Sequence, residues 1–360
     1  MKKILRKLIF IISIIFTGII TINFLGGTIV YGILFSTGRN TDDNNYLGLI
    51  TYSDIKDMYT KEELTFSSGS NKLQGYFYKA NDIDKLIVFS HGIYDYAESL
   101  LPQQKYFLDH GYNVFSYDSS GCGKSEGNVA SFSESLINLK SALEYLDETP
   151  KFKNYKKFLF GFSWGGYASA SILNFKLNNV YASVSLSGYN DAKHLIINKG
   201  KDMVSFIADM GAPVINMLQN NRAKGYLDYT AISGINNSSI PVYLIHSKWD
   251  KTVSYRDSII NAYLSNNMSK NVKTYLEEKY DNEAINRHLY LQFSNKAIKY
   301  QMEIKNKLKN IKNENEKKAF YQTIDKKLYN ELNDELFKSI LDFYNDSLKW
   351  FFTNSFIELS

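Results

Sequence analysis

The segment Gly161–Gly165, with the sequence GFSWG, contains the residue that is best suited to covalent chemistry. It follows the apolar run Phe158–Phe160 and precedes residues in helical rhythm, so it predicts a serine on a sharp turn from a strand into a helix. Glycines two positions before and after Ser163 are needed because side chains there would collide with the neighbouring strand and helix. The turn exposes a hydroxyl beside helix N-terminal N–H groups that can receive an oxyanion. Ser163 is therefore a candidate nucleophile.

A nucleophilic serine needs an acid further along the chain. A histidine imidazole takes the proton of the serine hydroxyl, and a carboxylate orients that imidazole. In alternating strand–helix folds, these residues occur along the chain in the order serine, acid, histidine. Asp250 comes just after the apolar run Val242–His246, in a loop from which a carboxylate can reach inward. Asp228 and Asp257 are rivals, but the first falls in a predicted lid and the second on the helix after the strand. Asp250 is the expected acid.

The histidine follows by position. The other four histidines do not come after Asp250: His91, His110, His194 and His246. His288 is therefore the expected base. A lone histidine is more often structural than catalytic, and the stretch Glu277–Arg287 before it has no clear turn pattern. The assignment depends on chain order alone.

The loop after an earlier strand offers a second oxyanion donor. In the sequence Ser90-His91-Gly92-Ile93-Tyr94, the glycine lets the backbone fold toward the serine. The N–H of Ile93 would then pair with the N–H of Trp164, the residue after the nucleophile. We interpret His91 as a side chain that braces this loop, and the Tyr94 hydroxyl as a further possible contributor.

A second glycine-rich segment, Gly121–Ser125, resembles a phosphate loop through its Gly-Lys-Ser sequence. Such a loop needs a glycine five positions before Gly123, where this chain has Asp118, so nucleotide binding is not indicated. Cys122 lies in the same turn and is the sole cysteine, which rules out an internal disulfide and gives no metal-ligand cluster. We expect it to be structural, and we expect neither a cofactor nor a metal.

The N-terminus predicts a membrane anchor. The segment Lys2–Lys7 supplies +4 of a formal net charge of +5, so the rest is nearly neutral and a nucleic-acid partner is not indicated. The uncharged run Leu8–Phe35 exceeds the roughly 20 residues that cross a bilayer. A cleaved signal peptide, with a usual apolar region of about 7–15 residues, and a buried core helix are the alternatives. Ser36–Gly38 is only a weak cleavage site.

The flanking charges predict the orientation of this anchor. Four cations precede the apolar run, whereas Arg39, Asp42 and Asp43 follow it. The excess of positive charge places the N-terminus in the cytoplasm. We therefore expect a single-pass protein of the cell membrane, with its catalytic domain outside the cytoplasm.

Strands and helices alternate from about residue 61. The expected strands are Leu64–Phe66, Leu73–Tyr78, Lys85–Ser90, Tyr112–Tyr117, Phe158–Phe160, Val180–Ser187, Val242–His246 and Val272–Leu276. The first two flank Ser68–Asn71, a hairpin sequence, and helices are expected near Leu100–Asp109 and Phe132–Asp147. Such alternation, with strands apolar on both faces, predicts an α/β fold with a doubly wound, mostly parallel sheet.

The chain divides by composition. The expected parts are an anchor (1–35), a polar stalk (36–60), a catalytic domain (61–290) with a lid insert (188–240), and a charge-rich helical C-terminal extension (291–360). The lid assignment depends on the apolar pieces Met203–Met210 and Val214–Leu218, for which extra core helices are the alternative. The extension is expected to be a solvated helical pair, with lipid-headgroup contact through its lysines left open.

Four motifs in this order resemble the α/β-hydrolase fold, and within it the serine aminopeptidase and monoacylglycerol-lipase-like group. They are His91-Gly92, Asp118-x-x-Gly121-x-Gly123-x-Ser125, Gly161-x-Ser163-x-Gly165 and the Asp250 loop, spread over roughly residues 61–290. The resemblance implies a triad of Ser163, Asp250 and His288, with Ile93 and Trp164 as oxyanion donors. Ser120 departs from the arginine usual in relatives, and residues 289–360 extend beyond the usual end.

The expected function is that of a membrane-anchored serine hydrolase that cleaves carboxylic esters, of lipid or acyl type, through an acyl-enzyme. A serine peptidase or aminopeptidase and an acyltransferase would use the same residues, and a tethered scaffold or binding protein on this fold remains the non-enzymatic alternative. The expected partners are a small-molecule ester or acyl substrate and the lipid bilayer. The oligomeric state stays open.

Overall fold

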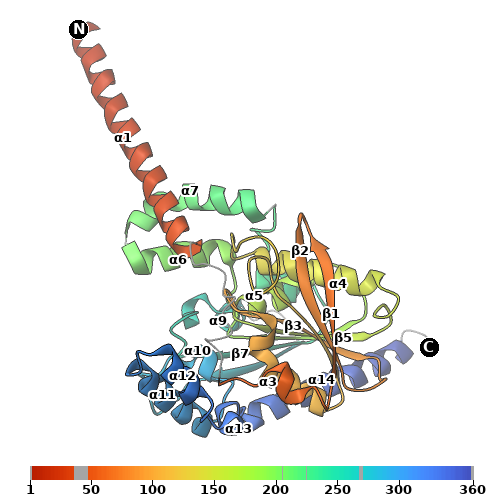
Figure 1. The fold of residues 1–360 in the computed structure, drawn as a ribbon. Coiled ribbons are helices and arrows are strands. Elements are labelled where there is room, and N and C mark those ends of the chain that lie inside the picture. Colours follow the sequence, from red (N-terminus) through yellow and green to blue (C-terminus); the bar gives the residue numbers. More distant parts are fainter. Residues whose placement is uncertain (1, 36–47, 205, 224, 267–270, 358–360) are drawn as a thin grey trace. The chain divides into compact units, whose positions relative to one another are not determined.

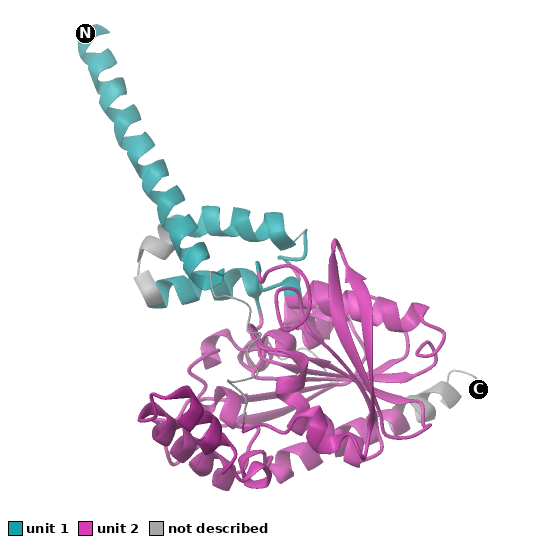
Figure 2. Ribbon diagram, viewed as in Figure 1, with its two compact units in different colours: residues 1–38, 130–134, 191–228 teal, residues 39–129, 135–190, 229–360 magenta. Residues whose placement is uncertain are grey.

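A computed structural model describes residues 2–35, 48–204, 206–223, 225–266 and 271–357. The chain forms two compact units, coloured separately in Figure 2. Unit 1 comprises residues 1–38, 130–134 and 191–228, and unit 2 comprises residues 39–129, 135–190 and 229–360. The predicted stalk lies partly outside the described residues. From residue 48 onward its segment packs within unit 2, where Ile55 is buried in the main hydrophobic core.

Unit 2 is built on an eight-stranded sheet with the strand order β1-β2-β4-β3-β5-β6-β7-β8. Its strands are β1 (Thr60–Ser68), β2 (Asn71–Lys79), β3 (Lys85–Ser90), β4 (Asn113–Tyr117), β5 (Lys156–Phe162), β6 (Val180–Leu186), β7 (Val242–Ser247) and β8 (Val272–Glu277). β1 and β2 form the predicted hairpin, and β2 also pairs antiparallel with β4. All other pairings are parallel. The predicted mostly parallel sheet is therefore confirmed.

The central strands explain the apolar runs in the sequence. β4 and β7 are buried along their whole length, and only the first residue of β3 and of β5 is partly exposed. A parallel sheet covered on both faces selects continuous apolar runs instead of alternation. The register pairs Ser90 with Gly161 and Phe162 with Leu186, so the carboxyl ends of β3, β5 and β6 lie at one edge.

Helices cover both faces of this sheet (Figure 1). One face packs against α3 (Leu101–Asp109) and α14 (Asp334–Ile357), whose apolar side chains join the core residues of β3, β5, β6 and β7. α4 (Glu134–Glu148) and α5 (Trp164–Ser171) lie on the other side. Shorter helices of unit 2 include α2 (Tyr52–Ile55), α8 (Ala231–Asn236), α9 (Ile259–Asn266) and α10 (Arg287–Tyr290).

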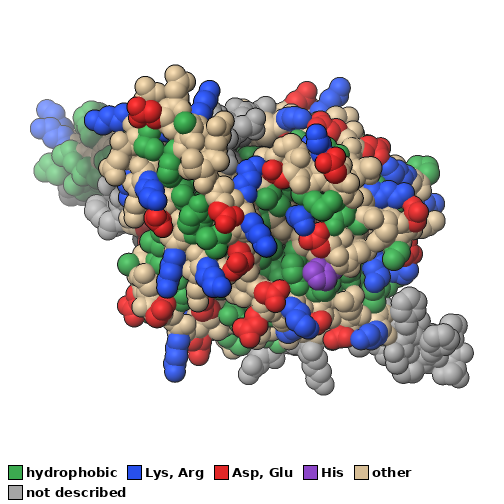
Figure 3. Space-filling view, turned by 60° about the horizontal axis from the view of Figure 1, so that its bottom comes forward, with side chains coloured by type: hydrophobic (Ala, Val, Ile, Leu, Met, Phe, Trp, Pro, Cys, Tyr) green, Lys and Arg blue, Asp and Glu red, His purple; other side chains and the backbone are tan. Residues whose placement is uncertain are grey.

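The C-terminal extension, expected to be a solvated helical pair, instead contributes α14 to the main hydrophobic core. Tyr344 of α14 is fully buried, and its hydroxyl donates a 2.8 Å hydrogen bond to the carbonyl of Leu159 in β5. α11 (Asn295–Lys309), α12 (Glu314–Tyr321) and α13 (Lys326–Tyr329) precede it. These three helices are charge-rich, and acidic and basic side chains intermingle on the face that Figure 3 presents.

Unit 1 combines α1 (Lys2–Phe35) with α6 (Ala192–Val204) and α7 (Phe206–Ala223). α1 has the length and composition of a membrane span, and a signal sequence meets the same criteria. No residue in its most apolar 18-residue window is buried. Of the predicted lid insert (188–240), residues 191–228 fold with α1, whereas α8 belongs to unit 2. The lid role itself stays a prediction.

Candidate active site

Ser163 occupies a strained turn between β5 and α5. Its backbone has φ 55° and ψ −109°, a left-handed conformation that residues other than glycine rarely adopt. A Cβ added to Gly161 would collide with the carbonyl of Gly165, and a Cβ added to Gly165 would collide with the carbonyl of Ser90. Both glycines are therefore required by close backbone approach, as the sequence pattern predicted.

Asp250 lies in the loop after β7 and is hydrogen-bonded to His288. The His288 Nδ1–H donates to Asp250 Oδ2 over 2.7 Å, and the backbone N–H groups of Thr252 and Val253 each donate to Oδ1 over 2.8 Å. Burial alone would raise the pKa of the Asp250 carboxyl, but these donors lower it below its ordinary value. The carboxylate is therefore ionised and fixes the tautomer of His288, leaving Nε2 as the acceptor.

His288 lies in the short helix α10, and the residue before that helix joins it to the Asp250 loop. The Asn286 side-chain oxygen accepts hydrogen bonds from the N–H of His288 (3.1 Å) and the N–H of Lys251 (2.8 Å). The Asn286 amide donates in turn to Thr252 Oγ1 over 2.9 Å. The N–H of Arg287 also donates to the carbonyl of Trp249 over 3.1 Å. Two loops from distant parts of the chain are thus held together around the Asp–His pair.

Ser163 is placed beside this pair by its neighbours. The ring of Phe162, the residue before Ser163, lies 5.0 Å from the His288 imidazole, measured between ring centroids. Ser187, at the end of the adjacent strand β6, donates from its hydroxyl to the carbonyl of His288 over 3.2 Å. The N–H of Ser163 donates to the carbonyl of Leu186 over 2.8 Å. Ser163 therefore directly follows a residue whose ring packs against His288, and the adjacent strand end is hydrogen-bonded to His288.

The loop after β3 approaches Ser163 at Gly92. A Cβ added to Gly92 would lie 3.7 Å from the Cβ of Ser163 and 3.3 Å from the ring of Phe162. The N–H of Gly165 donates to the carbonyl of His91 over 3.1 Å, which joins this loop to the first turn of α5. Ile93 follows Gly92 directly, and Trp164 begins α5. The two predicted oxyanion donors thus belong to the two segments that meet at the serine.

His91 braces this loop, as its position suggested. It is buried, its Nδ1–H donates to the carbonyl of Gly92 over 2.6 Å, and its Nε2 accepts from the N–H of Ser119 over 2.9 Å. Burial lowers the pKa of the His91 imidazole, so the ring is neutral near pH 7. It links the loops after β3 and β4 and has no nitrogen left for acid–base work.

The Gly121–Ser125 turn wraps around a buried carboxylate. Asp118 accepts hydrogen bonds from the N–H of Ala97 (2.8 Å) and the N–H of Lys124 (2.9 Å), and from the Tyr76 hydroxyl (3.0 Å). Burial raises the pKa of this carboxyl. A Cβ at Gly123 would collide with the carboxylate, which explains the glycine. The turn is thus a structural brace, and Cys122 within it is buried.

Two groups near the triad were not expected from the sequence. His246 is buried, lies 3.7 Å from Asp250 Oδ2, and donates from Nε2–H to the carbonyl of Val253 over 3.1 Å. Burial lowers its pKa to about 4. Arg287 pairs with Glu277 at the end of β8. In the sequence, only its position next to His288 indicates that Arg287 could matter. Its ion pair with Glu277 spans a loop, so no periodic pattern in the sequence predicts it.

The rival acids have other partners. Asp228 belongs to unit 1, where its 82% exposed side chain pairs with Lys193 over 3.4 Å. The Asp257 carboxylate accepts from the Ser254 hydroxyl over 2.7 Å and pairs with Arg256 over 3.3 Å. Within the described residues, no cluster of three or more histidine, cysteine or acidic side chains offers a metal site.

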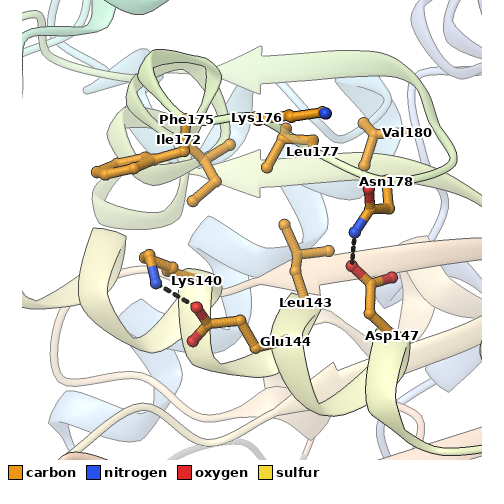
Figure 4. Close-up of a pocket in the computed structure, with 10 residues that line it drawn as sticks. All are labelled: Lys140, Leu143, Glu144, Asp147, Ile172, Phe175, Lys176, Leu177, Asn178 and Val180. Atoms are coloured by element: carbon orange, nitrogen blue, oxygen red, sulfur yellow. Dashed lines mark hydrogen bonds and ion pairs between the residues drawn. The ribbon is translucent and has the colours of Figure 1, made fainter.

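A cavity of about 180 Å³ lies between α4 and the segment that leads into β6 (Figure 4). It is lined by Lys140, Leu143, Glu144, Asp147, Ile172, Phe175, Lys176, Leu177, Asn178 and Val180. Lys140 pairs with Glu144, and Asn178 donates to Asp147 over 3.0 Å. Because Val180 begins β6, the cavity is at the sheet edge opposite Ser163. It is not part of the catalytic arrangement.

Comparisons with known proteins agree with this architecture. Residues 81–229 match the family model for serine aminopeptidases. No curated protein sequence matches the chain. An esterase structure from Pyrococcus furiosus is 20% identical, with a TM-score of 0.51, over 68% of this chain and 90% of that one.

Two further solved structures are similar at lower scores. An acylaminoacyl peptidase from Pyrococcus horikoshii is 16% identical, with a TM-score of 0.47, over 64% of this chain and 39% of that one. Est1E from Butyrivibrio proteoclasticus, solved with bound ferulic acid, is 18% identical, with a TM-score of 0.46, over 63% of this chain and 94% of that one. By its sheet, its serine turn and the similarity to the Pyrococcus furiosus esterase structure, the chain has the α/β-hydrolase fold, and residues 81–229 match the family model for serine aminopeptidases.

Proposed function

We propose that this α/β-hydrolase is a membrane-anchored enzyme that cleaves carboxylic esters of lipid or acyl type through Ser163, His288 and Asp250. The observation that supports this most directly is the 2.7 Å hydrogen bond between His288 Nδ1 and Asp250 Oδ2, beside a serine held at φ 55°. An oriented imidazole near a serine hydroxyl on a strained turn is the arrangement that activates a serine.

The reaction follows from these positions. Ser163 Oγ attacks the ester carbonyl while His288 Nε2 takes its proton, and the N–H groups of Ile93 and Trp164 stabilise the oxyanion. Asp250 stays ionised, because its pKa is lowered, and stabilises the imidazolium. His288 then returns the proton to the leaving alcohol as the carbonyl–oxygen bond breaks. Water, activated by the same histidine, releases the acid from the acyl-enzyme.

The membrane assignment is supported by α1. Its apolar window is unburied, and four cations precede the apolar run, which favours a retained anchor with a cytoplasmic N-terminus. The catalytic residues would then lie outside the cytoplasm. An anchored hydrolase at this surface has lipid-derived esters as its nearest substrates.

Peptide cleavage is the second candidate, because residues 81–229 match serine aminopeptidases. Both reactions pass through the same tetrahedral intermediate, so the triad does not distinguish them. A panel of p-nitrophenyl esters, monoacylglycerols and aminoacyl amides, compared by kcat/KM, separates the two. Turnover of amides with none of esters would replace the ester assignment with the peptidase one.

The catalytic assignment is tested with a fluorophosphonate probe on the full-length protein. The wild type should be labelled and Ser163→Ala should not. Asp250→Asn should reduce ester turnover by about 10⁴-fold, the loss typical of a triad acid. Asp228→Asn, which alters an exposed acid of the other unit, is the matched control and should keep full turnover. Folded wild-type protein with neither labelling nor turnover would exclude the enzymatic assignment.

A further inference from the structure

We propose that α7 lies in the headgroup region of the bilayer and that unit 1 is a membrane-interface module. A close contact between Gly27 of α1 and Gly211 of α7, here called the clamp, would hold α7 at this level. The partner is the boundary between lipid headgroups and acyl chains. This inference rests on the proposed anchoring of α1 and goes further, because it assigns the α6–α7 hairpin, expected from the sequence to be a lid, to the membrane surface.

The first observation is a backbone contact between α1 and α7. A Cβ added to Gly27 would lie 2.8 Å from the carbonyl oxygen of Gly211 and 2.9 Å from the Cβ of Val214. A Cβ added to Gly211 would lie 2.8 Å from the Cα of Gly27. Glycine at both positions allows this approach, and small residues at crossing points are the usual means of close helix packing in membranes. At this point the backbones of the two helices approach each other directly.

The second observation is the level of this contact along α1. Gly27 comes twenty residues after Lys7, the last cation before the apolar run. At about 1.5 Å per residue this is about 30 Å, the thickness of the hydrocarbon core. If Lys7 marks one boundary of that core, Gly27 marks the other. α7 therefore crosses α1 where the hydrocarbon gives way to headgroups.

The third observation is the change in the surroundings of α1 near this level. The most apolar window of α1 is entirely unburied, as lipid exposure requires. Val30, by contrast, is 1% exposed, and the Tyr31 hydroxyl donates to the carbonyl of Ala130. The rings of Phe35 and Phe132 lie 5.2 Å apart. One face of the last turns of α1 is thus packed by protein, while the preceding turns are left for lipid.

The character of α7 agrees with this position. It runs crosswise to α1, as Figure 1 shows, and so lies along the membrane plane when α1 spans the bilayer. It has no charged residue from Met210 to Asn221, and Met217 is 48% exposed. Its partner α6 carries Lys193, Lys199 and Lys201, which suit contact with anionic headgroups. Interfacial elements combine an apolar side with a side rich in lysine or arginine, and the α6–α7 pair supplies the first through α7 and the second through α6.

The test places nitroxide probes in the full-length protein in nanodiscs and measures their depth from oxygen and nickel-chelate accessibility. Cys122 is the sole native cysteine and is buried, so single new cysteines are labelled selectively. Met217→Cys should report the headgroup–acyl boundary. Ile14→Cys on α1 should report the hydrocarbon core. Leu264→Cys on α9, equally exposed at 47%, should report water.

The clamp is tested with matched glycine substitutions in the same helix. Gly27→Leu should remove the lipid contact of the Met217 probe, because the new side chain separates α1 from α7. Gly211→Leu should do the same from the other side. Gly18→Leu is the control, because a Cβ there meets nothing within 4 Å, and should leave the probe depth unchanged. Unchanged fluorophosphonate labelling of Ser163 would show that unit 2 stays folded in each variant.

The outcomes separate this inference from the proposed function. An aqueous Met217 probe with Ile14 deep in the hydrocarbon overturns the inference and leaves the anchor intact. An aqueous Ile14 probe overturns the anchor, and the inference with it. Equal loss of lipid contact in the Gly18 and Gly27 variants overturns the clamp. Failure of Ser163 labelling alone removes the catalytic assignment and does not alter the probe depths.

Discussion

Arg287, the residue before His288, forms a paired hydrogen bond with Glu277. The Arg287 Nε–H and Nη2–H donate to the two carboxylate oxygens of Glu277 over 2.9 and 2.8 Å, and the Arg287 side chain is only 3% exposed. Ser247 donates from its hydroxyl to the same carboxylate over 2.5 Å, and the guanidinium carbon lies 4.2 Å from the centroid of the Tyr280 ring. The pair connects the ends of β7 and β8 to the residue before His288.

We therefore predict that Arg287 is a positioning residue for His288. Arg287→Met should lower kcat by about 10- to 100-fold with little change in KM, because His288 would lose its fixed orientation without loss of substrate contacts. It should also lower the free energy of unfolding by about 3–5 kcal/mol, because the Glu277 carboxylate stays buried without its partner. Steady-state kinetics and urea unfolding measure the two effects.

A double variant separates positioning from stability. Glu277→Met combined with Arg287→Met removes both buried charges and should recover most of the unfolding free energy. It should not recover kcat, since the tie to the end of β8 is still missing. Arg287→Lys keeps the charge without the paired geometry and should fall between wild type and Arg287→Met. Recovery of kcat in the double variant would refute the positioning role.

Asn286 should act on the same loop through its side-chain oxygen. Asn286→Ala removes the acceptor for the N–H groups of His288 and Lys251, and should lower the free energy of unfolding by about 1 kcal/mol and reduce kcat. Asn286→Asp keeps that acceptor and loses only the donor to Thr252, so it should retain more activity. Equal kcat values for the two variants would contradict this account.

The strain at Ser163 has a measurable consequence. A residue other than glycine held at φ 55° and ψ −109° costs roughly 1–3 kcal/mol. Ser163→Ala and Ser163→Gly both abolish activity, but only glycine relieves the strain. Part of the gain is lost because glycine is more flexible in the unfolded chain. The glycine variant should therefore be more stable than the alanine variant by about 1 kcal/mol in urea unfolding. An alanine variant of equal or greater stability would show that the turn is not strained.

Local sequence rules predicted the strands and the serine turn well. The apolar runs that became β3, β4, β5 and β7 are continuous because those strands are buried on both faces. Gly161 and Gly165 are required by backbone contacts that every turn of this type makes, so the pattern is readable without a structure. Chain order selected His288, and the position of Asp250 in a loop just after an apolar run selected it over Asp228 and Asp257; the structure joins the two residues by a hydrogen bond.

Local sequence patterns did not predict the contacts between segments that are distant in the chain. α14 looked like part of an appended extension because its apolar residues follow a charge-rich stretch, yet Tyr344 lies in the main core. Glu277 and Arg287 look like ordinary surface residues in the sequence, and their pairing appears only when a loop brings them together. His246 is likewise an ordinary strand residue until the fold places it 3.7 Å from Asp250.

His246 should make stability depend on pH in a defined window. Burial lowers its pKa to about 4, whereas an unfolded histidine titrates near 6.5. Between these values the unfolded chain binds more protons than the folded one, so the free energy of unfolding falls as the pH falls from about 6.5 to 4. The whole effect is about 3 kcal/mol.

The variant His246→Gln tests this expectation, because its amide can still donate to the carbonyl of Val253. Its free energy of unfolding should fall less across this pH window than that of the wild type, whatever its stability at pH 7. Urea unfolding of both proteins in detergent, followed by tryptophan fluorescence at several pH values, gives the difference, in which the contribution of His91 cancels. Parallel curves for the two proteins would show that His246 is not the group that titrates.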